Sequence, residues 1–479
     1  MKFSWNNYST TTFDEYVTPQ RRLRVHSKKI GTFLKSLSLK ELNEINTATK
    51  SVIQSMGISF RVFSDDDYEG QDRAWPLDFI PRIIRQKEWS EVEKGLKQRV
   101  RALNFFIEDC YNKKSFLKES KMDESLILNS SAYKKYCIGI KLKFNVWAQI
   151  CGSDLIKAED GKFYVLEDNL RVPSGVSYML ENRMIMKKVF PELFLQYGVT
   201  SVDAYPTKLY ENLASFSYSR SKKPEIVLLT PGVLNSAYFE HSFLAQQMGI
   251  DLVEGRDLIR GNDGFIYKKT IEGLLKVDVI YRRIDDDYLD PECGNPNSVI
   301  GVRGLIKAWQ EKKVAIINAP GCGIADDKAV YAFVPEMIKF FLNEEPIIKN
   351  IKTFLMKDKN DRDYAEINFK KMVIKPVSES GGYGIVIGKD CSKSEQNSTI
   401  RKIRNNPGNF VAQPLISLST APTYCGKSLE PRHLDLRPFI LSGQHQYVTV
   451  GGLTRVALKK NSTIVNSSQG GGSKDTWIV

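Results

Sequence analysis

The stretch FYVLEDNLRVPSG, residues 163–175, carries oxygen-bearing side chains at a spacing that suits a metal ion. Neighbouring side chains of a strand point to opposite faces, so Glu167 and Asn169 are predicted to share one face. Carboxylate and amide oxygens suit a hard cation such as Mg²⁺. Asp154 lies thirteen residues before Glu167, across the turn AEDG, and a hairpin would bring it to the same cation. These three residues therefore predict a Mg²⁺ site.

The glycine-rich stretch IKPVSESGGYGIVIG, residues 374–388, could hold phosphate groups. Lys375 ends a predicted strand there. The turn that follows contains Ser380, Gly381, Gly382 and Gly384. Consecutive backbone N–H groups in such a turn can bind phosphate oxygens, and the lysine adds a positive charge. The stretch is neither a Walker A loop nor a Rossmann fingerprint, because it lies between two strands. An ordinary glycine-rich hairpin is the alternative interpretation.

A second lysine could contact the same anion. Lys328 lies in the first turn of a helix predicted over residues 326–342. A cation at a helix N-terminus opposes the helix dipole, and binding of an anion there would offset this cost. A local ion pair with Asp326 or Asp327 is the alternative interpretation.

Two arginines could act on a phosphoryl group or a carboxylate. Asp435 and Arg437 alternate onto one face of the strand HLDLRPFIL, and Arg455 comes from the nearby strand LTRVALK. Two guanidinium groups on one sheet surface would suit either anion. Charges on an exposed sheet face are the alternative interpretation.

Several predicted elements would have to position these residues. Apolar side chains at helical spacing predict an amphipathic helix over 89–111. A β-α-β unit is predicted over 225–255, with its helix at 237–249. Strands are predicted at 144–152, 161–168, 277–283, 314–320, 371–376 and 383–388, with further short strands at 409–416, 433–441, 446–450, 453–459 and 462–466. A kink is expected at Pro335.

The composition is that of a soluble protein with several packed units. The chain has 479 residues, of which 42% are hydrophobic and 26% charged. Seven scattered cysteines, none in a C-x-x-C pair, favour a reducing cytoplasm over a disulfide framework or a zinc site. The sequence contains no apolar run long enough for a membrane span and no apolar signal-peptide core, so neither is predicted. The net charge of +13 is spread out, which favours a solvated basic surface over a nucleic-acid binder.

Taken together, these residues resemble those of the ATP-grasp superfamily, which includes glutathione synthetases. Its usual order is a helix-borne lysine, a lysine-proline strand with a glycine-rich loop, an adenine hinge, an arginine-bearing strand and a closing E-x-N. Lys328, Lys375, the hinge residue Gln413 and Arg437 follow that order here, whereas E-x-N stands near the start. The order resembles that of the circularly permuted ATP-grasp type-2 family.

Long stretches of the sequence carry this resemblance, from residue 60 to the last residue approximately. They are RAWPLDFIPRII, LEDNLRVPSGVSYMLENR, NSAYFEHSFLAQQMGIDLVEGRDL, YRRIDDDYLDP, LEPRHLDLRPF, GGLTRVALK and VNSSQGGGSKDTW. The sequence departs from the commonest pattern at the hinge, where Gln413 replaces a glutamate. The resemblance therefore leaves the adenine contact open.

The resemblance implies an α/β fold with α+β lobes. This would be a circularly permuted ATP-grasp fold with a pre-ATP-grasp β-α-β lobe and a mostly helical N-terminal region. The expected parts are residues 1–110 (the helical region), 111–220 (the permuted C-terminal part of the core, with the Mg²⁺ strands), 221–300 (the pre-ATP-grasp lobe), 301–350 (the first part of the core), 351–412 (the lid with its glycine-rich loop) and 413–479 (the remaining core).

The resemblance also implies a carboxylate–amine ligase that uses ATP and Mg²⁺. Lys328 and Lys375 would hold phosphate oxygens, and the turn at 380–384 would close over them. Arg437 and Arg455 would stabilise negative oxygens during the reaction. The product would be an amide or peptide bond, formed through an acylphosphate.

The substrates would be a small-molecule carboxylate and an amine, such as an amino acid or a peptide. Their candidate contacts are Arg171, Ser174, Ser177, Tyr178, Asn182, Arg183, Glu240, His241 and Asn466. A polar strand-to-helix connection is the alternative for the first six. Two other functions stay open, namely a non-catalytic nucleotide-binding module that serves a partner enzyme and a basic nucleic-acid binder.

Overall fold

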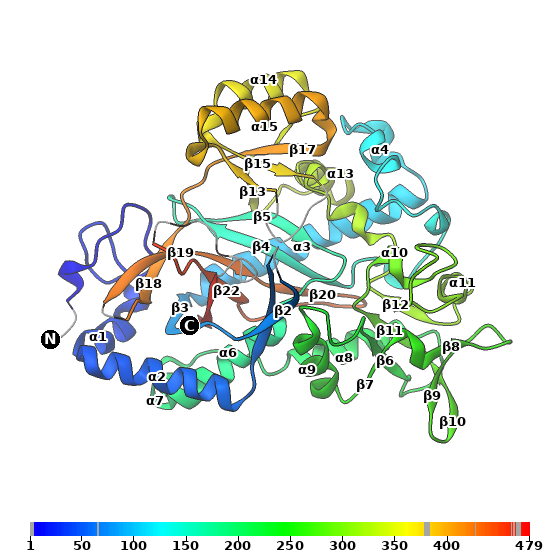
Figure 1. Ribbon diagram of the computed structural model, residues 1–479, viewed down its shortest axis with the longest axis horizontal. Helices are drawn as coiled ribbons and strands as arrows, with labels where there is room; N and C mark the ends of the chain where they lie inside the picture. Colours follow the sequence, from blue (N-terminus) through cyan, green and yellow to red (C-terminus); the bar gives the residue numbers. More distant parts are fainter. Residues whose placement is uncertain are drawn as a thin grey trace.

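The computed structural model describes residues 4–64, 67–377, 384–426, 428–460, 462, 465 and 471–479. A large sheet lies in the middle of the molecule, a smaller α/β lid lies above it in Figure 1, and a parallel-sheet lobe lies at the lower right. This mixture of helix and sheet in several lobes confirms the fold class predicted from the sequence. Within the described part of the chain, no helix is both long and apolar enough to cross a membrane.

The central sheet is built from ten strands of the described residues. They are β3 (Leu77–Ile84), β4 (Ile150–Lys157), β5 (Phe163–Asn169), β13 (Lys349–Asn350), β18 (Thr420–Tyr424), β19 (Leu429–Arg437), β20 (Phe439–Ser442), β21 (Gln446–Val448), β22 (Leu453–Val456) and β23 (Gly472–Ile478). Along the main path the order is β13-β5-β4-β19-β22-β23-β3, while β18 pairs with β19 and β20 pairs with β21 and β4.

Strands from opposite ends of the chain lie side by side in this sheet. The hairpin β4–β5 joins β19 through the pair Leu155–Leu436 and joins β20 through Cys151–Ile440. At the other edge, β3 pairs in parallel with β23. The chain therefore closes its central sheet with an early segment inserted beside late ones, as expected for a permuted order.

One long helix covers a face of the sheet. The helix α3 (Gln86–Tyr111) buries Val100, Leu103 and Phe106 in the same core as Val165 of β5. This confirms the amphipathic helix predicted over 89–111. A strand was predicted at 144–152, but β4 begins later, because residues 143–145 form a 3-10 turn (η4) with positive φ at two residues. Positive φ interrupts a strand.

The N-terminal region contains strands that the sequence did not predict. It comprises η1 (Trp5–Asn7), η2 (Val25–Ser27), α1 (Lys28–Ser36), α2 (Leu39–Ser55), the hairpin β1 (Ser59–Ser64) with β2 (Asp67–Ala74), and β3. The expectation of a mostly helical region was therefore incomplete. All eight residues of β3 are buried, so no polar-apolar alternation marks it as a strand, and its partner β23 lies at the far end of the chain.

The parallel-sheet lobe confirms the predicted β-α-β unit. Its strands are β6 (Ile226–Leu229), β7 (Asp251–Val253), β11 (Val279–Arg282) and β12 (Ala315–Ile317), in the order β12-β11-β6-β7. The helix α9 (Tyr238–Met248) joins β6 to β7 and ends at Gly249, whose φ of 66° is left-handed. A small antiparallel sheet extends the lobe with β8 (Leu258–Arg260), β9 (Ile266–Thr270) and β10 (Gly273–Val277).

Nine further α-helices lie outside the lid in the described part of the chain. They are α4 (Ser115–Glu119), α5 (Ser125–Leu128), α6 (Val176–Val189), α7 (Pro191–Tyr197), α8 (Tyr205–Ser215), α10 (Asp286–Leu289), α11 (Leu305–Gln310), α12 (Lys328–Tyr331) and α13 (Val334–Leu342). The single helix predicted over 326–342 is thus two helices. Pro335 lies in the first turn of α13, where its missing N–H costs nothing, so the expected kink is a complete break.

The lid has its own small core. Its sheet has the order β14-β17-β15-β16, built from β14 (Phe354–Leu355), β15 (Met372–Pro376), β16 (Val386–Ile387) and β17 (Phe410–Pro414). The helices α14 (Lys359–Ile367) and α15 (Lys393–Asn405) cover it (Figure 1). β15 and β16 pair as the predicted hairpin, whereas the strand predicted at 462–466 lies mostly outside the described residues.

A buried ion pair fastens the N-terminal segment to the sheet. Arg82 of β3 donates from Nε to Glu15 Oε2 (2.9 Å) and from Nη2 to Oε1 (2.6 Å), and Ser419 also donates to Glu15. Burial alone would raise the pKa of Glu15, but Arg82 and Lys157 outweigh it and lower the pKa to about 2. The charged carboxylate is therefore the form that stabilises the fold.

Replacing Glu15 by Gln should destabilise the protein near neutral pH, by about 3–5 kcal/mol, because Arg82 loses its buried counter-charge. The stabilisation by Glu15 is complete above the carboxyl pKa of the unfolded chain, about 4.5, and is lost as pH falls toward 2. The difference in unfolding free energy between wild type and Glu15→Gln should therefore shrink over that interval in urea titrations. A difference that stays constant with pH would contradict this assignment.

Deleting residues 472–479 should prevent stable folding. β23 lies between β22 and β3, and all seven of its residues are buried. Deletion would therefore remove an inner strand of the central sheet and expose the edges of both neighbouring strands. Circular dichroism and solubility of the truncated chain measure this, and a folded truncated chain would contradict it.

Candidate active site

The strand β5 presents two oxygen-bearing side chains on one face, as the sequence predicted. Glu167 lies opposite Asp154 of β4, and Asn169 lies opposite Gly152. The register shifts between Asp154 and Leu155, which leaves Leu166 without a partner on β4. Such a β-bulge re-aims side chains and is common beside active sites.

Asp168, the middle residue of the E-D-N motif, anchors β5 on the face opposite to Glu167 and Asn169. Asp168 accepts hydrogen bonds from Arg99 of α3, at 2.6 Å from Nη2, and from Ser153 Oγ at 2.8 Å. Arg99 also donates to Asn350 of β13 at 2.6 Å. Asp168 and Arg99 are both buried. Their ion pair therefore holds β5 against α3, so that Glu167 and Asn169 face the opposite side.

Asp154 is the counter-ion of both predicted arginines. Arg437 donates from Nε to Asp154 Oδ1 (2.5 Å) and from Nη2 to Oδ2 (2.8 Å). Arg455 Nη2 donates to Oδ2 at 2.7 Å. Burial alone would raise the pKa of Asp154, but the two guanidinium groups outweigh burial and hold the pKa below its usual value. The sequence placed Asp154 among the metal ligands and did not predict this pairing.

A second carboxylate completes the arginine cluster. Asp435 pairs with Arg455 in the β19–β22 register, and Arg455 Nε donates to Asp435 Oδ1 at 2.9 Å. Arg437 approaches Glu167 to 4.0 Å. The structure therefore brings together all the residues that the sequence assigned to the two arginine strands.

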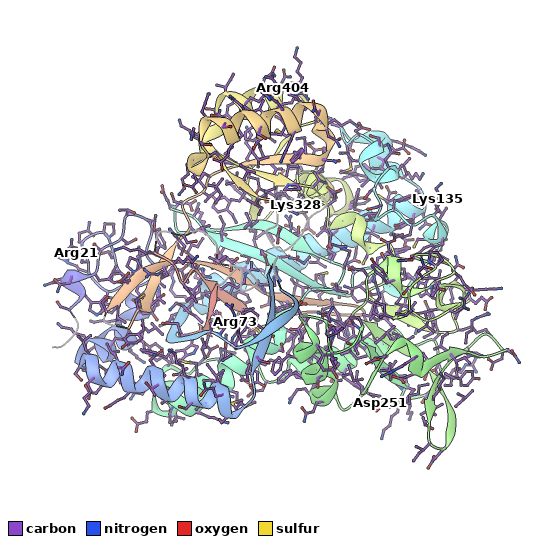
Figure 2. All side chains as sticks on the ribbon, viewed as in Figure 1. Arg21, Arg73, Lys135, Asp251, Lys328 and Arg404 are labelled. Atoms are coloured by element: carbon purple, nitrogen blue, oxygen red, sulfur yellow. The ribbon has the colours of Figure 1, made fainter. Side chains whose placement is uncertain are left out.

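The lid and the helix α12 bring lysines to the same place. Lys375 is buried on β15, and burial lowers its pKa even though Glu167 opposes the shift. The pKa of Glu167 is raised by burial and by Asp154, although Lys375, Arg437 and Lys328 act against the shift. Figure 2 shows Lys328 where the lid meets the central sheet. Both lysines thus act electrostatically on Glu167, as their predicted roles require.

One cavity between the lid and the sheet is lined by both aliphatic and charged or polar side chains. The aliphatic ones include Ile156, Leu166, Val373, Ile387 and Leu418. The charged or polar ones are Asp154, Glu167, Lys375, Gln413, Asp435 and Arg455. A smaller pocket beside it is lined by Glu167, Lys328, Lys375 and Gln413 together. The predicted hinge residue Gln413 thus borders the cavity, and its Nε2 donates to Thr353 Oγ1 at 2.9 Å.

The donor set fits a Mg²⁺ ion shared with phosphates. No cluster of three or more His, Cys, Asp or Glu side chains suited to a metal is found among the described residues. Mg²⁺ commonly takes only one or two carboxylates and completes its shell with water and substrate phosphates. Glu167 and Asn169 could supply two such oxygens, because Asn169 uses only its Nδ2 for the bond to Gly152. Both oxygens of Asp154 are held by guanidinium groups, so its role as a metal ligand stays a prediction.

Four predicted site residues lie outside the described residues, namely Ser380, Gly381, Gly382 and Asn466. Gly384 is described and has a φ of 68°, a left-handed conformation that glycine adopts without strain. Their roles in phosphate and substrate binding stay predictions.

Two candidate substrate contacts, Arg171 and Ser174, lie in the segment after β5. Arg171 donates to Asp326 at 2.6 Å, comes within 3.5 Å of Asp285, and remains about one-third exposed at 35%. The Ser174 carbonyl accepts from Arg437 at 3.2 Å, and its hydroxyl accepts from Arg283 at 2.6 Å. Ser174 therefore contacts the arginine cluster, whereas Arg171 pairs with Asp326, which lines the smaller pocket.

Three further candidates are buried, and two of them, Glu240 and Ser177, form the contact that holds the start of α6. Glu240 accepts from the backbone N–H of Gly175 (2.7 Å), and from Ser177 through its N–H and its hydroxyl. A carboxylate at a helix N-terminus is stabilising. His241 is buried against Thr230, and burial lowers its pKa to about 2. Burial of Glu240, His241 and Ser177 disfavours their predicted contact with a substrate.

The remaining candidates hold the C-terminal strand and an aromatic stack. Asn182 bridges Trp75 and Ser473, and Arg183 pairs with Asp475 at 2.9 Å. Tyr178 stacks on Trp75 with 3.8 Å between ring centroids. All three side chains are buried. These contacts fit the alternative interpretation from the sequence, a polar strand-to-helix connection, better than they fit contact with a substrate.

The sequence analysis did not identify Arg99 and Arg283. These two arginines hold residues of the candidate site in place through buried contacts. Arg99 lies on the apolar face of the predicted helix 89–111, between Leu96 and Leu103. A charged side chain on an apolar helix face requires a buried partner, and this signal could have identified it. Arg283, which holds Ser174 and Glu240, belongs to the stretch YRRIDDDYLDP and has no such local signal.

Comparison with known proteins relates most of the chain to a circularly permuted ATP-grasp family. The family model described as "Circularly permuted ATP-grasp type 2" matches residues 81–457 of this chain. An uncharacterised protein of Synechocystis sp. is 47% identical over 468 residues, which cover 98% of this chain and 97% of that protein. An uncharacterised protein of Mycobacterium tuberculosis is 43% identical, with 98% and 84% covered.

A further relative carries an enzyme name. It is the Frankia casuarinae protein "Putative glutamate--cysteine ligase 2-2", 36% identical over 472 residues, which cover 98% of this chain and 54% of that protein. Among solved structures, a glutathione synthetase-like effector from Globodera pallida, in its apo form, matches with a TM-score of 0.59 at 13% identity. The match covers 92% of this chain and 98% of that one, and shows a shared fold.

Replacing Asp154 by Asn should destabilise the protein by about 3–5 kcal/mol, because two buried guanidinium groups lose their shared counter-charge. Glu167→Gln is the matched control, since Glu167 lies 4.0 Å from Arg437 and its side chain is 33% exposed. Urea unfolding should separate the two variants clearly. Equal stability of Asp154→Asn and wild type would show that Asp154 does not hold the arginine cluster.

Proposed function

Since the chain belongs to the circularly permuted ATP-grasp type 2 family, we propose that it is an ATP- and Mg²⁺-dependent carboxylate–amine ligase. The observation that carries this proposal is the cavity between lid and sheet, whose lining combines aliphatic with charged side chains. The aliphatic side chains suit a flat base, and the charged ones suit a chain of phosphates. The seven free cysteines are consistent with work in the reducing cytoplasm.

The cations around the cavity would hold the phosphate groups. Lys375 and Lys328 reach the cavity from two separate elements, the lid strand β15 and the helix α12. Buried cations need a counter-charge, and burial already lowers the pKa of Lys375. A bound triphosphate would supply that counter-charge. Gln413 would border the base from β17.

Glu167 and Asn169 would hold Mg²⁺ together with the phosphates. When bound, the ion would neutralise charge that develops between the outer phosphates. The chain itself keeps the two oxygens on one face through the bulge at Leu166 and the Arg99–Asp168 pair. Because β5 is already held in place, Glu167 and Asn169 would need no reorganisation when the nucleotide binds.

The reaction would proceed in two transfers. An oxygen of the substrate carboxylate attacks the terminal phosphorus of ATP, the bond to ADP breaks, and an acylphosphate forms. The amine then attacks the acyl carbon, phosphate leaves, and the nitrogen loses a proton as the amide forms. Arg437 and Arg455 would stabilise the negative oxygens of both steps, because Asp154, which lines the cavity, fixes both guanidinium groups.

Amino acids or peptides are the substrates that this account favours. The Frankia relative is named for joining glutamate to cysteine, although the chain spans only about half of that protein. Ser174 lies beside Arg437, and Arg171 pairs with Asp326 of the smaller pocket. Both would contact the substrate from the segment after β5. Ser380, Gly381 and Gly382 would close the lid over the phosphates, and Asn466 would face the substrate, as predicted from the sequence.

A screen for ADP release tests the reaction. Amino acids and small peptides are offered in pairs, as donors and acceptors, with Mg²⁺ and ATP. At least one pair should raise ADP release above the ATP-only background, and Glu167→Gln should abolish the rise while leaving the fold intact. A nucleotide-binding module without catalysis would bind ATP but show no pair that raises release, and this result would reject the ligase proposal.

Replacing Lys375 by Ala should weaken ATP binding about ten- to hundredfold, because a charged hydrogen bond contributes roughly 1.5–3 kcal/mol. Lys371→Ala is the matched control, since Lys371 precedes the same strand but is exposed. Isothermal titration with a non-hydrolysable ATP analogue measures both. If Lys375→Ala and the control bind equally well, Lys375 does not hold the phosphates.

A further inference from the structure

A second cavity lies at the other end of β5, apart from the nucleotide cavity. It has a volume of about 490 Å³ and is lined by three elements, namely the first turns of α3, the start of β5 with its preceding turn, and the start of β13. Phe163 opens β5 and Glu167 lies four residues on, so about 13 Å of strand separates the two cavities. They share no lining residue.

Four cations surround this cavity. They are Arg85, Lys87, Lys162 and Lys349, each with an exposed side chain. Within the ranges that the structure describes, none of these four side chains has a hydrogen-bond or ion-pair partner. Four unpaired cations around one hollow repel one another, and this repulsion is relieved when an anion binds between them.

The carboxylates nearby neutralise these cations only in part. Glu88 lines the cavity, but it pairs at 2.5 Å with the buried Lys157. Asp160 accepts from the Tyr164 hydroxyl and from the Lys162 backbone N–H. Glu91 is the one remaining carboxylate in the lining of the described cavity. Glu91 and Asp160 together offset two of the four cations, so the cavity keeps an excess of about two positive charges.

The backbone of α3 adds to this field. Arg85 precedes the first turn of a helix of 26 residues, and no side chain caps that helix end. The partial positive charge of a helix N-terminus attracts anions, and phosphates most readily. Val92, Phe163 and Ile347 provide an apolar wall beside the cations. The cavity volume falls in the range of ordinary small-molecule sites.

We propose that this cavity binds a phosphorylated small molecule carrying two to three negative charges. A phosphate monoester or diphosphate matches the excess charge, whereas a single carboxylate would leave about half of it unpaired. Lysines bind phosphates well as point charges and need no fixed geometry. The site is separate from the nucleotide cavity and does not depend on the proposed ligase reaction.

The site shares its three elements with the ion pair behind the metal strand. Arg99 of α3 holds Asp168 of β5 and Asn350 of β13, and Asn350 follows Lys349 directly. An anion that draws the start of α3, β5 and β13 together would therefore tighten the support of Glu167 and Asn169. Occupancy of the second site would stiffen the strand that faces the nucleotide.

Inorganic pyrophosphate is the probe, measured by equilibrium dialysis at low salt with the nucleotide cavity filled by a non-hydrolysable ATP analogue. Wild type should bind one equivalent, and Lys162→Glu combined with Lys349→Glu should weaken binding at least tenfold. The control combines Lys28→Glu with Lys50→Glu, which change the net charge equally at exposed sites elsewhere and should leave binding unchanged. Lys375→Ala should also retain binding, because it alters only the nucleotide cavity.

Three results would overturn the proposal. They are the absence of pyrophosphate binding to wild type, unchanged binding by the Lys162→Glu and Lys349→Glu variant, and an equal loss in the control variant. The last would mean general attraction to a basic protein. Thermal unfolding of each variant shows that it is folded, and Arg85→Ala, which removes one charge without reversing it, should weaken binding to a smaller degree.

Discussion

The ion pairs of Asp154 with Arg437 and Arg455 are the interaction on which the rest of the site depends. They join β4, from the first third of the chain, to β19 and β22 near its end. Removing the carboxylate would deprive Arg437 and Arg455 of their shared counter-charge and leave Arg455 with Asp435 alone, whereas the intact cluster holds both guanidinium groups in place. A single buried carboxylate thus couples the closure of the sheet to the geometry of the arginine cluster.

The permuted order changes which contacts are local but preserves the arrangement around the cavity. The metal strand precedes the lid in sequence, and β5 still lies beside the lysines of the lid and of α12. The new ends are secured by pairing β3 with β23 and by the buried pair of Glu15 with Arg82. Contacts far apart in sequence therefore carry much of the stability here.

The sequence predicted the features that depend on local spacing. Alternation placed Glu167 with Asn169 and Asp435 with Arg437, and helical periodicity placed α3. It could not predict pairings whose partners lie hundreds of residues apart, such as Asp154 with Arg437. It also could not distinguish Glu240, a buried helix cap, from a polar residue in a cleft, because both follow the same pattern of charge.

A crystal structure with a non-hydrolysable ATP analogue and Mn²⁺ in place of Mg²⁺ tests the central claim most directly. The account predicts anomalous density for Mn²⁺ against Glu167 and Asn169, and the triphosphate against Lys328 and Lys375. The base would lie between aliphatic side chains of lid and sheet, with Asp154 still paired to both arginines. Nucleotide bound outside this cavity, or Mn²⁺ bound away from β5, would contradict the account.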